Sequence, residues 1–351
     1  MGKLYKKRAK KVTKRRRLRG GKFVASGSAG CIFRPALKCA GSNTRRNGYV
    51  SKMGSKNNID AEWNSSNTPR RINTESKYFV YPTEKCNYGV LNASNEQEKC
   101  DVDSIGRQIL QLPDGGTDLS KITVPYEDMP AFFEGFVNIF DGISLLHSRG
   151  YAHRDIKLQN MVGIRNDDGI YQLRLIDFGL SDTFNGLAYY PRADNYKYWS
   201  YEMRLLDYRY PYTMDDVSNF MKTINYIDVP SWIYKNPDGT SKLSRDFIET
   251  LRIKIHSSRD SKLQIIQASE VYALGLALYE AWYSKTSYIS LTGKDVIKSN
   301  TTYRDIPDEI SQLIFDLVAD MSNADPFLRL SLDDTKVRLT RIIPFLTAVL
   351  I

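Results

Sequence analysis

Four polar side chains in the middle of the chain stand at a spacing that could do chemistry. Asp155 is followed two positions later by Lys157 and five positions later by Asn160, and Asp177 comes seventeen positions after Asn160. Between Asn160 and Asp177, two β-type runs flank an Asn-Asp-Asp-Gly turn at 166–169, a pattern that predicts a hairpin. Because a hairpin returns the chain to its start, we expect Asn160 and Asp177 to lie side by side. Two such oxygen ligands suit magnesium ions bound to ATP.

The run His153-Arg-Asp-Ile-Lys-Leu-Gln-Asn160 matches H-R-D-x-K-x-x-N, the catalytic loop of protein kinases. Phosphoryl transfer is catalysed mainly by positioning and by charge neutralisation. Asp155 is therefore expected to act as the catalytic base that orients an acceptor hydroxyl, and Lys157 to offset charge on the transferring phosphoryl group. Asn160 and Asp177 are the expected Mg2+ ligands.

A glycine-rich segment and a strand lysine lie upstream. Ala25-x-Gly27-x-x-Gly30-x-Ile32 fits a loop that covers phosphates, since glycines let backbone amides approach phosphate oxygens. Tyr49-Val-Ser-Lys52 resembles the V-A-I-K strand motif, whose lysine contacts the α- and β-phosphates of ATP. An ordinary tight hairpin and a surface lysine are the alternatives, and Ala25 replaces the first glycine of the pattern. The expected ATP-binding residues are Val24, Ala25, Gly27, Gly30, Ile32, Lys52 and Glu62, with Glu62 as the ion-pair partner of Lys52.

Taken together, these segments resemble the eukaryotic-type protein kinase superfamily over about residues 22–340. The resemblance implies structural support from His153 and Arg154, and a buried pair between Glu202, in Trp-Ser-Tyr-Glu, and Arg329, in Asp-Pro-Phe-Leu-Arg. It also implies that Glu270, in Glu-Val-Tyr-Ala-Leu-Gly, braces the catalytic loop. Within the superfamily, the segments 35–39 and 49–52 resemble serine/threonine protein kinases of large nucleocytoplasmic DNA viruses.

The expected fold is α+β and bilobal, with a small strand-rich N-lobe at 22–112 and a larger helical C-lobe at 113–351. Apolar runs at 49–53, 78–81 and 108–112 predict strands. Apolar spacings of three and four predict helices around 132–146, 271–282 and 310–321, and the apolar end of the chain predicts a closing core helix. The helix that carries Glu62 should be short or distorted, because residues 64–69 form helix poorly.

A long segment at 203–268 is expected to be an insertion, with candidate helices at 215–227 and 246–256. Its alternative roles are substrate or partner contacts, or none. In the segment after Asp177, Arg154 is available to bind an anion, for which Thr183, Tyr189, Tyr190 and Tyr196 are candidate phosphorylation sites and Asp194 a permanent substitute. Asn195 stands where serine/threonine kinases usually carry a threonine.

The net charge of +10 comes from the N-terminal end of the chain. Residues 1–21 hold eleven basic side chains and no acidic one, so the remaining chain has 39 basic against 40 acidic residues. This segment is expected to be a disordered basic tail that could bind nucleic acid or another polyanion through residues 3–19. A nuclear-localisation signal and a substrate-docking arm are the alternatives. The neutral body argues against a protein that only binds nucleic acid.

The four cysteines form no Cys-x-x-Cys pair, so neither a zinc ribbon nor a redox motif is indicated. Four reduced thiols are expected, together with an intracellular location: host cytoplasm or nucleus, or the virion, if the viral resemblance holds. No membrane span is expected, since the apolar end at 342–351 is too short.

The function expected from all of this is an enzyme, a serine/threonine protein kinase that uses ATP and Mg2+ to phosphorylate protein substrates. The first alternative is a pseudokinase or scaffold protein with a basic, nucleic-acid-binding tail. It is disfavoured because Lys52, Asp155, Asn160 and Asp177 are all present. A small-molecule phosphotransferase of related fold is the second alternative, and such enzymes usually lack the His-Arg-Asp-x-Lys loop.

Overall fold

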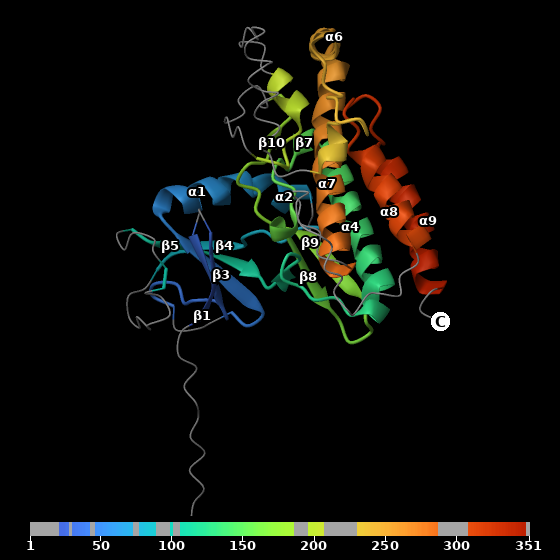
Figure 1. Ribbon diagram of the computed structural model, residues 1–351. Coiled ribbons are helices and arrows are strands. Elements are labelled where there is room, and N and C mark those ends of the chain that lie inside the picture. Colours follow the sequence, from blue (N-terminus) through green and yellow to red (C-terminus); the bar gives the residue numbers. More distant parts are fainter. Residues whose placement is uncertain are drawn as a thin grey trace, which may run out of the picture. The chain divides into compact units, whose positions relative to one another are not determined.

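The protein is an α+β structure with a strand-rich part and a helical part (Figure 1). The computed structural model describes residues 21–27, 30–42, 46–72, 77–88, 99–100, 106–185, 196–206, 230–286 and 308–348. Contact density divides the chain into two compact units, one of residues up to 59 with 83–112, the other of 60–82 with 113–351. Most of the basic tail and the candidate helix at 215–227 lie outside the described residues.

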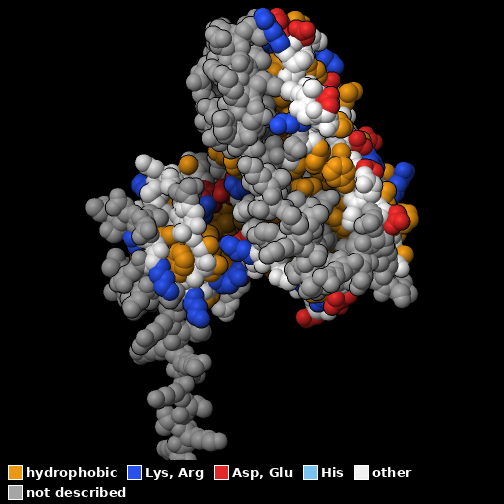
Figure 2. Space-filling view, viewed as in Figure 1, with side chains coloured by type: hydrophobic (Ala, Val, Ile, Leu, Met, Phe, Trp, Pro, Cys, Tyr) orange, Lys and Arg blue, Asp and Glu red, His pale blue; other side chains and the backbone are white. Residues whose placement is uncertain are grey.

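The strand-rich unit is built on a five-stranded sheet of order β1-β2-β3-β5-β4. Its strands are β1 (Lys22–Gly27), β2 (Gly30–Arg34), β3 (Tyr49–Gly54), β4 (Glu84–Asn87) and β5 (Gln108–Pro113). One face of the sheet buries Phe33, Met53 and Ile109 in a small apolar core. Lys and Arg side chains are scattered over the visible surface of this unit (Figure 2). The predicted strands at 49–53 and 108–112 are confirmed, and β4 is an addition to them.

The helix that carries Glu62 is interrupted as expected. It runs as α1 (Lys56–Ser65), stops at Ser66, and is followed by the short α2 (Asn67–Ile72). The hydroxyls of Ser65 and Ser66 both donate to the backbone carbonyl of Glu62, at 3.1 and 2.7 Å. Such side-chain bonds back onto a helix turn compete with its backbone pattern and bend it.

The expectation of four reduced thiols is wrong. Cys31 is bonded to Cys100, and Cys39 is bonded to Cys86, so all four cysteines are in disulfides. Both bonds lie within the strand-rich unit, and they join residues 69 and 47 positions apart. Sequence spacing did not reveal them, because pairing depends on which β-carbons the folded sheet brings together. The intracellular location rested partly on reduced thiols and stays a prediction.

Removing the Cys31–Cys100 bond should destabilise the strand-rich unit. A Cys31→Ala/Cys100→Ala variant is expected to lose about 2–4 kcal/mol of unfolding free energy, since the bond closes a long loop. Thermal unfolding with and without a reductant measures this. Adding the reductant should lower the unfolding temperature of the wild type. The decrease should be larger for the wild type than for the double variant. Identical curves for oxidised and reduced wild type would contradict the disulfides.

The helical unit is a set of long helices packed around one apolar core (Figure 1). The helices are α4 (Met129–Ser148), α6 (Arg245–His256), α7 (Arg259–Thr286), α8 (Asp308–Met321) and α9 (Leu332–Ala348). Two small sheets complete it: β6 (Thr117–Asp118), β8 (Met161–Arg165) and β9 (Tyr171–Leu175) in the order β6-β8-β9, and β7 (Tyr151–Ala152) with β10 (Asp182–Thr183). The predicted core helices are confirmed, including the closing helix as far as residue 348.

The centre of this core is α4, whose aromatic stripe of Phe132, Phe133 and Phe136 is fully buried. Among the described residues, α4 is the one helix long and apolar enough to cross a membrane, but more than half of it is buried inside the protein. Its side chains therefore serve as a core face. The residue before α4, Asp128, makes no capping bond and instead binds Arg165 and the Tyr171 hydroxyl.

The predicted strand at 78–81 needs correction. Residues 78–81 are not a strand: Phe79 forms an isolated bridge with Leu175, and the segment belongs to the helical unit. A short apolar run fits a buried connection as well as it fits a strand. Helix α7 already starts at Arg259, within the insertion predicted at 203–268, and the extent of that insertion stays a prediction. The predicted helix at 246–256 is confirmed as α6, and its apolar side Ile248, Leu251 and Ile255 enters the core.

Candidate active site

The catalytic-loop residues follow α4 and β7 and are fixed by a hairpin. Strands β8 and β9 pair antiparallel from Met161 opposite Leu175 to Arg165 opposite Tyr171. Beyond the last pair, the Ile176 amide donates to the Asn160 carbonyl at 2.9 Å. The turn at 166–169 therefore brings Asn160 next to the residue that precedes Asp177, as the sequence predicted.

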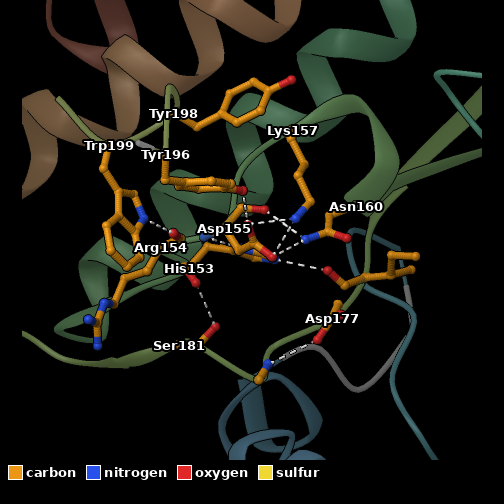
Figure 3. Close-up of polar contacts among 12 residues, drawn as sticks. His153, Arg154, Asp155, Lys157, Asn160, Asp177, Ser181, Tyr196, Tyr198 and Trp199 are labelled. Atoms are coloured by element: carbon orange, nitrogen blue, oxygen red, sulfur yellow. Dashed lines mark hydrogen bonds and ion pairs between the residues drawn. The ribbon is translucent and has the colours of Figure 1, made fainter. Parts of the chain in front are cut away.

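The carboxylate of Asp155 is surrounded by hydrogen-bond donors (Figure 3). Lys157 Nζ lies 2.9 Å from Oδ1 and 3.0 Å from Oδ2, and Asn160 Nδ2 lies 2.6 Å from Oδ2. Asn160 Nδ2 also donates to the Asp155 carbonyl at 2.9 Å. Asp155 itself is buried. The arrangement gives one acceptor oriented by an ammonium group and an amide.

A third donor to Asp155 is Tyr196, whose hydroxyl bonds Oδ1. Burial, and then the bond to Asp155, raises the pKa of the Tyr196 hydroxyl far above its usual value of 10, so it remains a protonated donor. The sequence had marked Tyr196 only as a candidate phosphorylation site. Its place 41 positions beyond Asp155 gave no periodic signal, and only the fold brings it there.

His153 and Arg154 shape the backbone of the loop. The Asp155 amide donates to His153 Nδ1 at 3.3 Å, so Nε2 carries the proton and donates to the Ile176 carbonyl at 3.1 Å. Arg154 has a positive φ of 69°, a conformation that costs a non-glycine residue about 1–3 kcal/mol. Its carbonyl is held by Trp199 Nε1 at 2.8 Å. Its side chain points away from Asp155 (Figure 3).

Glu270, on α7, ties the catalytic loop to two helices. Its Oε1 accepts the Arg154 amide at 2.6 Å, and its Oε2 lies 2.8 Å from Nε2 of His147, at the end of α4. Both side chains, His147 and Glu270, are nearly fully buried. The single carboxylate of Glu270 thus reaches both partners, and it holds the strained Arg154 backbone in place.

Glu202 and Arg329 are brought together as the resemblance implied. Arg329 donates from both terminal nitrogens to the two carboxylate oxygens of Glu202, and both side chains are completely buried. The third guanidinium nitrogen, Nε, donates to the Asn323 carbonyl at 2.8 Å. This pair fixes the short helix η5 (Tyr201–Leu206) against the core.

The donor set of Asn160 and Asp177 fits a magnesium ion that also binds phosphate. The amide nitrogen of Asn160 is used by Asp155, which leaves its side-chain oxygen as the atom to face a cation. Asp177 adds a carboxylate, of which Oδ1 also accepts the Gly179 amide at 3.2 Å. Within the described ranges, no three His, Cys, Asp or Glu side chains cluster as metal ligands. Magnesium commonly takes one or two carboxylates plus phosphate oxygens and water.

Three of the predicted ATP-binding residues of the strand-rich unit share one face of its sheet. Ala25 lies opposite Ile32 across β1 and β2, and Ile32 lies opposite Lys52 across β2 and β3. Directly opposed residues point to the same face. The alternate residues Phe33 and Met53 fill the core on the other face. The three strands thus present Ala25, Ile32 and Lys52 on the face opposite that core.

Gly27 and Gly30 lie at the closed end of the β1–β2 hairpin, and they differ in whether their surroundings leave space for a side chain. A β-carbon on Gly30 would lie 2.4 Å from the Met53 carbonyl oxygen, and Gly30 has φ +146°. A β-carbon on Gly27 would meet no atom within 4 Å. Packing therefore requires a glycine at position 30, but not at position 27.

These two glycines give a matched pair of variants. Gly27→Ala should fold normally and raise the KM for ATP about tenfold, as expected if a backbone–phosphate hydrogen bond is weakened by ~1.4 kcal/mol. Gly30→Ala should lower the thermal stability of the unit. Steady-state kinetics and thermal unfolding of both variants test this. An unchanged KM for Gly27→Ala would show that the hairpin does not cover phosphates.

Two predicted site elements stay predictions. Lys52 and Glu62 are each buried, but they belong to different units, and their pairing is not tested. Of the candidates for phosphorylation, Thr183 lies in β10, paired opposite Tyr151, whereas Tyr189 and Tyr190 lie outside the described residues. Asp194, the expected permanent substitute, and Asn195 lie outside them as well.

Comparison with known proteins finds partial similarity to protein kinases. The chain is 30% identical over 157 residues to the mitogen-activated protein kinase kinase mkk2 of Aspergillus fumigatus, which covers 39% of this chain and 28% of that protein. It is 38% identical over 76 residues to CBL-interacting protein kinase 4 of Oryza sativa subsp. japonica, covering 21% and 16% of the two chains. It is 34% identical over 80 residues to the serine/threonine-protein kinase chk1 of Schizosaccharomyces pombe, covering 22% and 15%.

The matched segments thus span less than a third of these relatives' lengths. No family model matches the chain. The similarity supports a place in the kinase superfamily, and no viral relative is among these proteins.

Proposed function

We propose that this chain is a serine/threonine protein kinase that transfers the γ-phosphate of ATP to protein hydroxyls. The observation that carries the proposal is the grouping of Asp155, Lys157 and Asn160, with Asp177 placed beside Asn160 by the β8–β9 hairpin. Partial similarity to serine/threonine kinases supports the same reaction class.

Each residue has a role in the proposed reaction. Asp155 accepts a hydrogen bond from the acceptor hydroxyl and directs its oxygen toward the γ-phosphorus. Lys157, whose Nζ lies 2.9 Å from Asp155 Oδ1, would offset charge on the transferring group. Asn160 and Asp177 would hold Mg2+, which when bound neutralises charge on the phosphate oxygens. Lys52 would hold the α- and β-phosphates.

A scaffold or pseudokinase is the competing function. It would keep the buried pairs Glu202–Arg329 and His147–Glu270, which support the fold without chemistry. The donors directed at Asp155 favour an enzyme, because a scaffold has no need to orient a carboxylate in this way.

Phosphate transfer from γ-labelled ATP tests the proposal. Purified wild type is incubated with Mg2+ and generic protein acceptors, beside a Lys52→Ala variant, and the labelled amino acids are then identified. We expect label on serine and threonine from the wild type and at least a hundredfold less from Lys52→Ala, on the order of the ~10²–10³ assigned to one electrostatic contact. Equal label from both would mean contamination. Phosphotyrosine as the main product would overturn the serine/threonine specificity.

The basic tail, the location and the viral resemblance are separate proposals. Binding of nucleic acid or another polyanion by residues 3–19 rests on their charge alone. If about six of these charges contacted phosphates, the log–log slope of affinity against salt would be near −5. Deleting residues 1–21 should then abolish salt-dependent retention on DNA. An intracellular or virion location is proposed from the resemblance to viral kinases.

A further inference from the structure

The carboxylate of Asp155 receives one donor from outside its own loop. Lys157 and Asn160 lie two and five positions from Asp155 in the chain, so both donors belong to the same loop as Asp155. Tyr196 comes from 41 positions away and bonds Oδ1. A carboxylate offers about four acceptor positions, and the torsion that rotates it is soft. A donor from a separate segment therefore adds a further restraint on this rotation.

The ring of Tyr196 is itself fixed by the catalytic loop and its neighbours. It lies edge-on to Trp199, with ring centroids 5.3 Å apart, and Trp199 is bonded to the Arg154 carbonyl. It also lies 5.5 Å from the Tyr198 ring. Lys157 Nζ is 5.4 Å from the centroid of the Tyr196 ring, within the range of a cation–π contact. One side chain thus contacts both the proposed base and the proposed ammonium group (Figure 3).

We propose that Tyr196 is a positioning residue for phosphoryl transfer: its hydroxyl fixes the orientation of Asp155 and its ring fixes Lys157. The inference rests on the proposed function and adds a residue from outside the catalytic loop. A small misplacement of a reacting group lowers the rate without changing how the nucleotide binds. Loss of the Tyr196 hydroxyl should therefore reduce kcat and leave the KM for ATP unchanged.

Tyr196→Phe tests this, because it removes the hydroxyl and keeps the packed ring. We expect kcat to fall roughly tenfold to a hundredfold, the range for a lost hydrogen bond to a charged group, with the KM for ATP within about twofold. Tyr171→Phe is the matched control. It removes a buried tyrosine hydroxyl bonded to another carboxylate, that of Asp128, and should leave kcat unchanged. Thermal unfolding of both variants shows whether they remain folded.

A double-variant cycle separates positioning from a general structural effect. If Tyr196 acts through Asp155, adding Tyr196→Phe to Asp155→Asn should lower kcat by less than twofold more, because residues that act as a unit are not additive. A full additional loss in the double variant would overturn the proposal. So would a rise in kcat for Tyr196→Phe alone, which would mean that the hydroxyl competes with the acceptor. Absence of any Asp155-dependent transfer in the wild type would instead refute the proposed function.

Discussion

Replacing Asp155 by Asn is expected to lower kcat for phosphate transfer by about 10²–10⁴, the usual contribution of a positioned base. The amide has nearly the same shape, but it accepts at one atom where the carboxylate accepts at two. Lys157, Asn160 and Tyr196 all direct donors at this group. The amide NH2 of asparagine would face these donors with a donor of its own. It also cannot take up the proton of the substrate hydroxyl.

The measurement is steady-state kinetics together with direct binding of ATP. The affinity for ATP should change little, since Asp155 is expected to contact the acceptor and not the nucleotide. Asp168→Asn, in the exposed turn between β8 and β9, is the matched control and should retain wild-type kcat. If Asp155→Asn kept more than a tenth of the wild-type kcat, Asp155 would not be the base.

Replacing Glu202 by Gln should have the largest effect on stability, a loss of about 3–5 kcal/mol. Both side chains of the pair are completely buried. The variant therefore leaves the positive charge of Arg329 buried without the negative charge that balanced it. Removing one partner of a buried pair costs far more than the pair contributes, because an uncompensated charge stays in a medium of low polarity.

Thermal or urea unfolding measures this loss. Asp141→Asn is the control, because it breaks a partly exposed pair with Lys336 in the same unit and should cost no more than ~1 kcal/mol. Equal effects of the two variants would mean that Glu202 and Arg329 do not form the buried pair seen here.

The sequence predicted the catalytic loop because its residues are close in the chain. The spacing of Asp155, Lys157 and Asn160, and the turn before Asp177, are local patterns, and a hairpin converts them directly into proximity. The pairing of Glu202 with Arg329, 127 positions apart, was reached only through resemblance to a family.

Other features depend on tertiary contacts that no local pattern encodes. The Cys31–Cys100 bond joins a strand residue to one between β4 and β5, and only the fold brings the two together. Tyr196 bonds Asp155, and three residues later Trp199 donates a hydrogen bond to the Arg154 carbonyl of the same loop. These two contacts hold the segment 196–199 against the loop. The run at 78–81 was mistaken for a strand because burial on all sides gives the same composition in a strand and in a connection.

We propose that Asn160 and Asp177 hold the magnesium of a bound nucleotide beside Asp155, and a crystal structure with Mg2+ and a non-hydrolysable ATP analogue tests this central claim most directly. We predict oxygens of Asn160 and Asp177 within about 2.0–2.1 Å of magnesium. A nucleotide bound away from these residues would contradict the account.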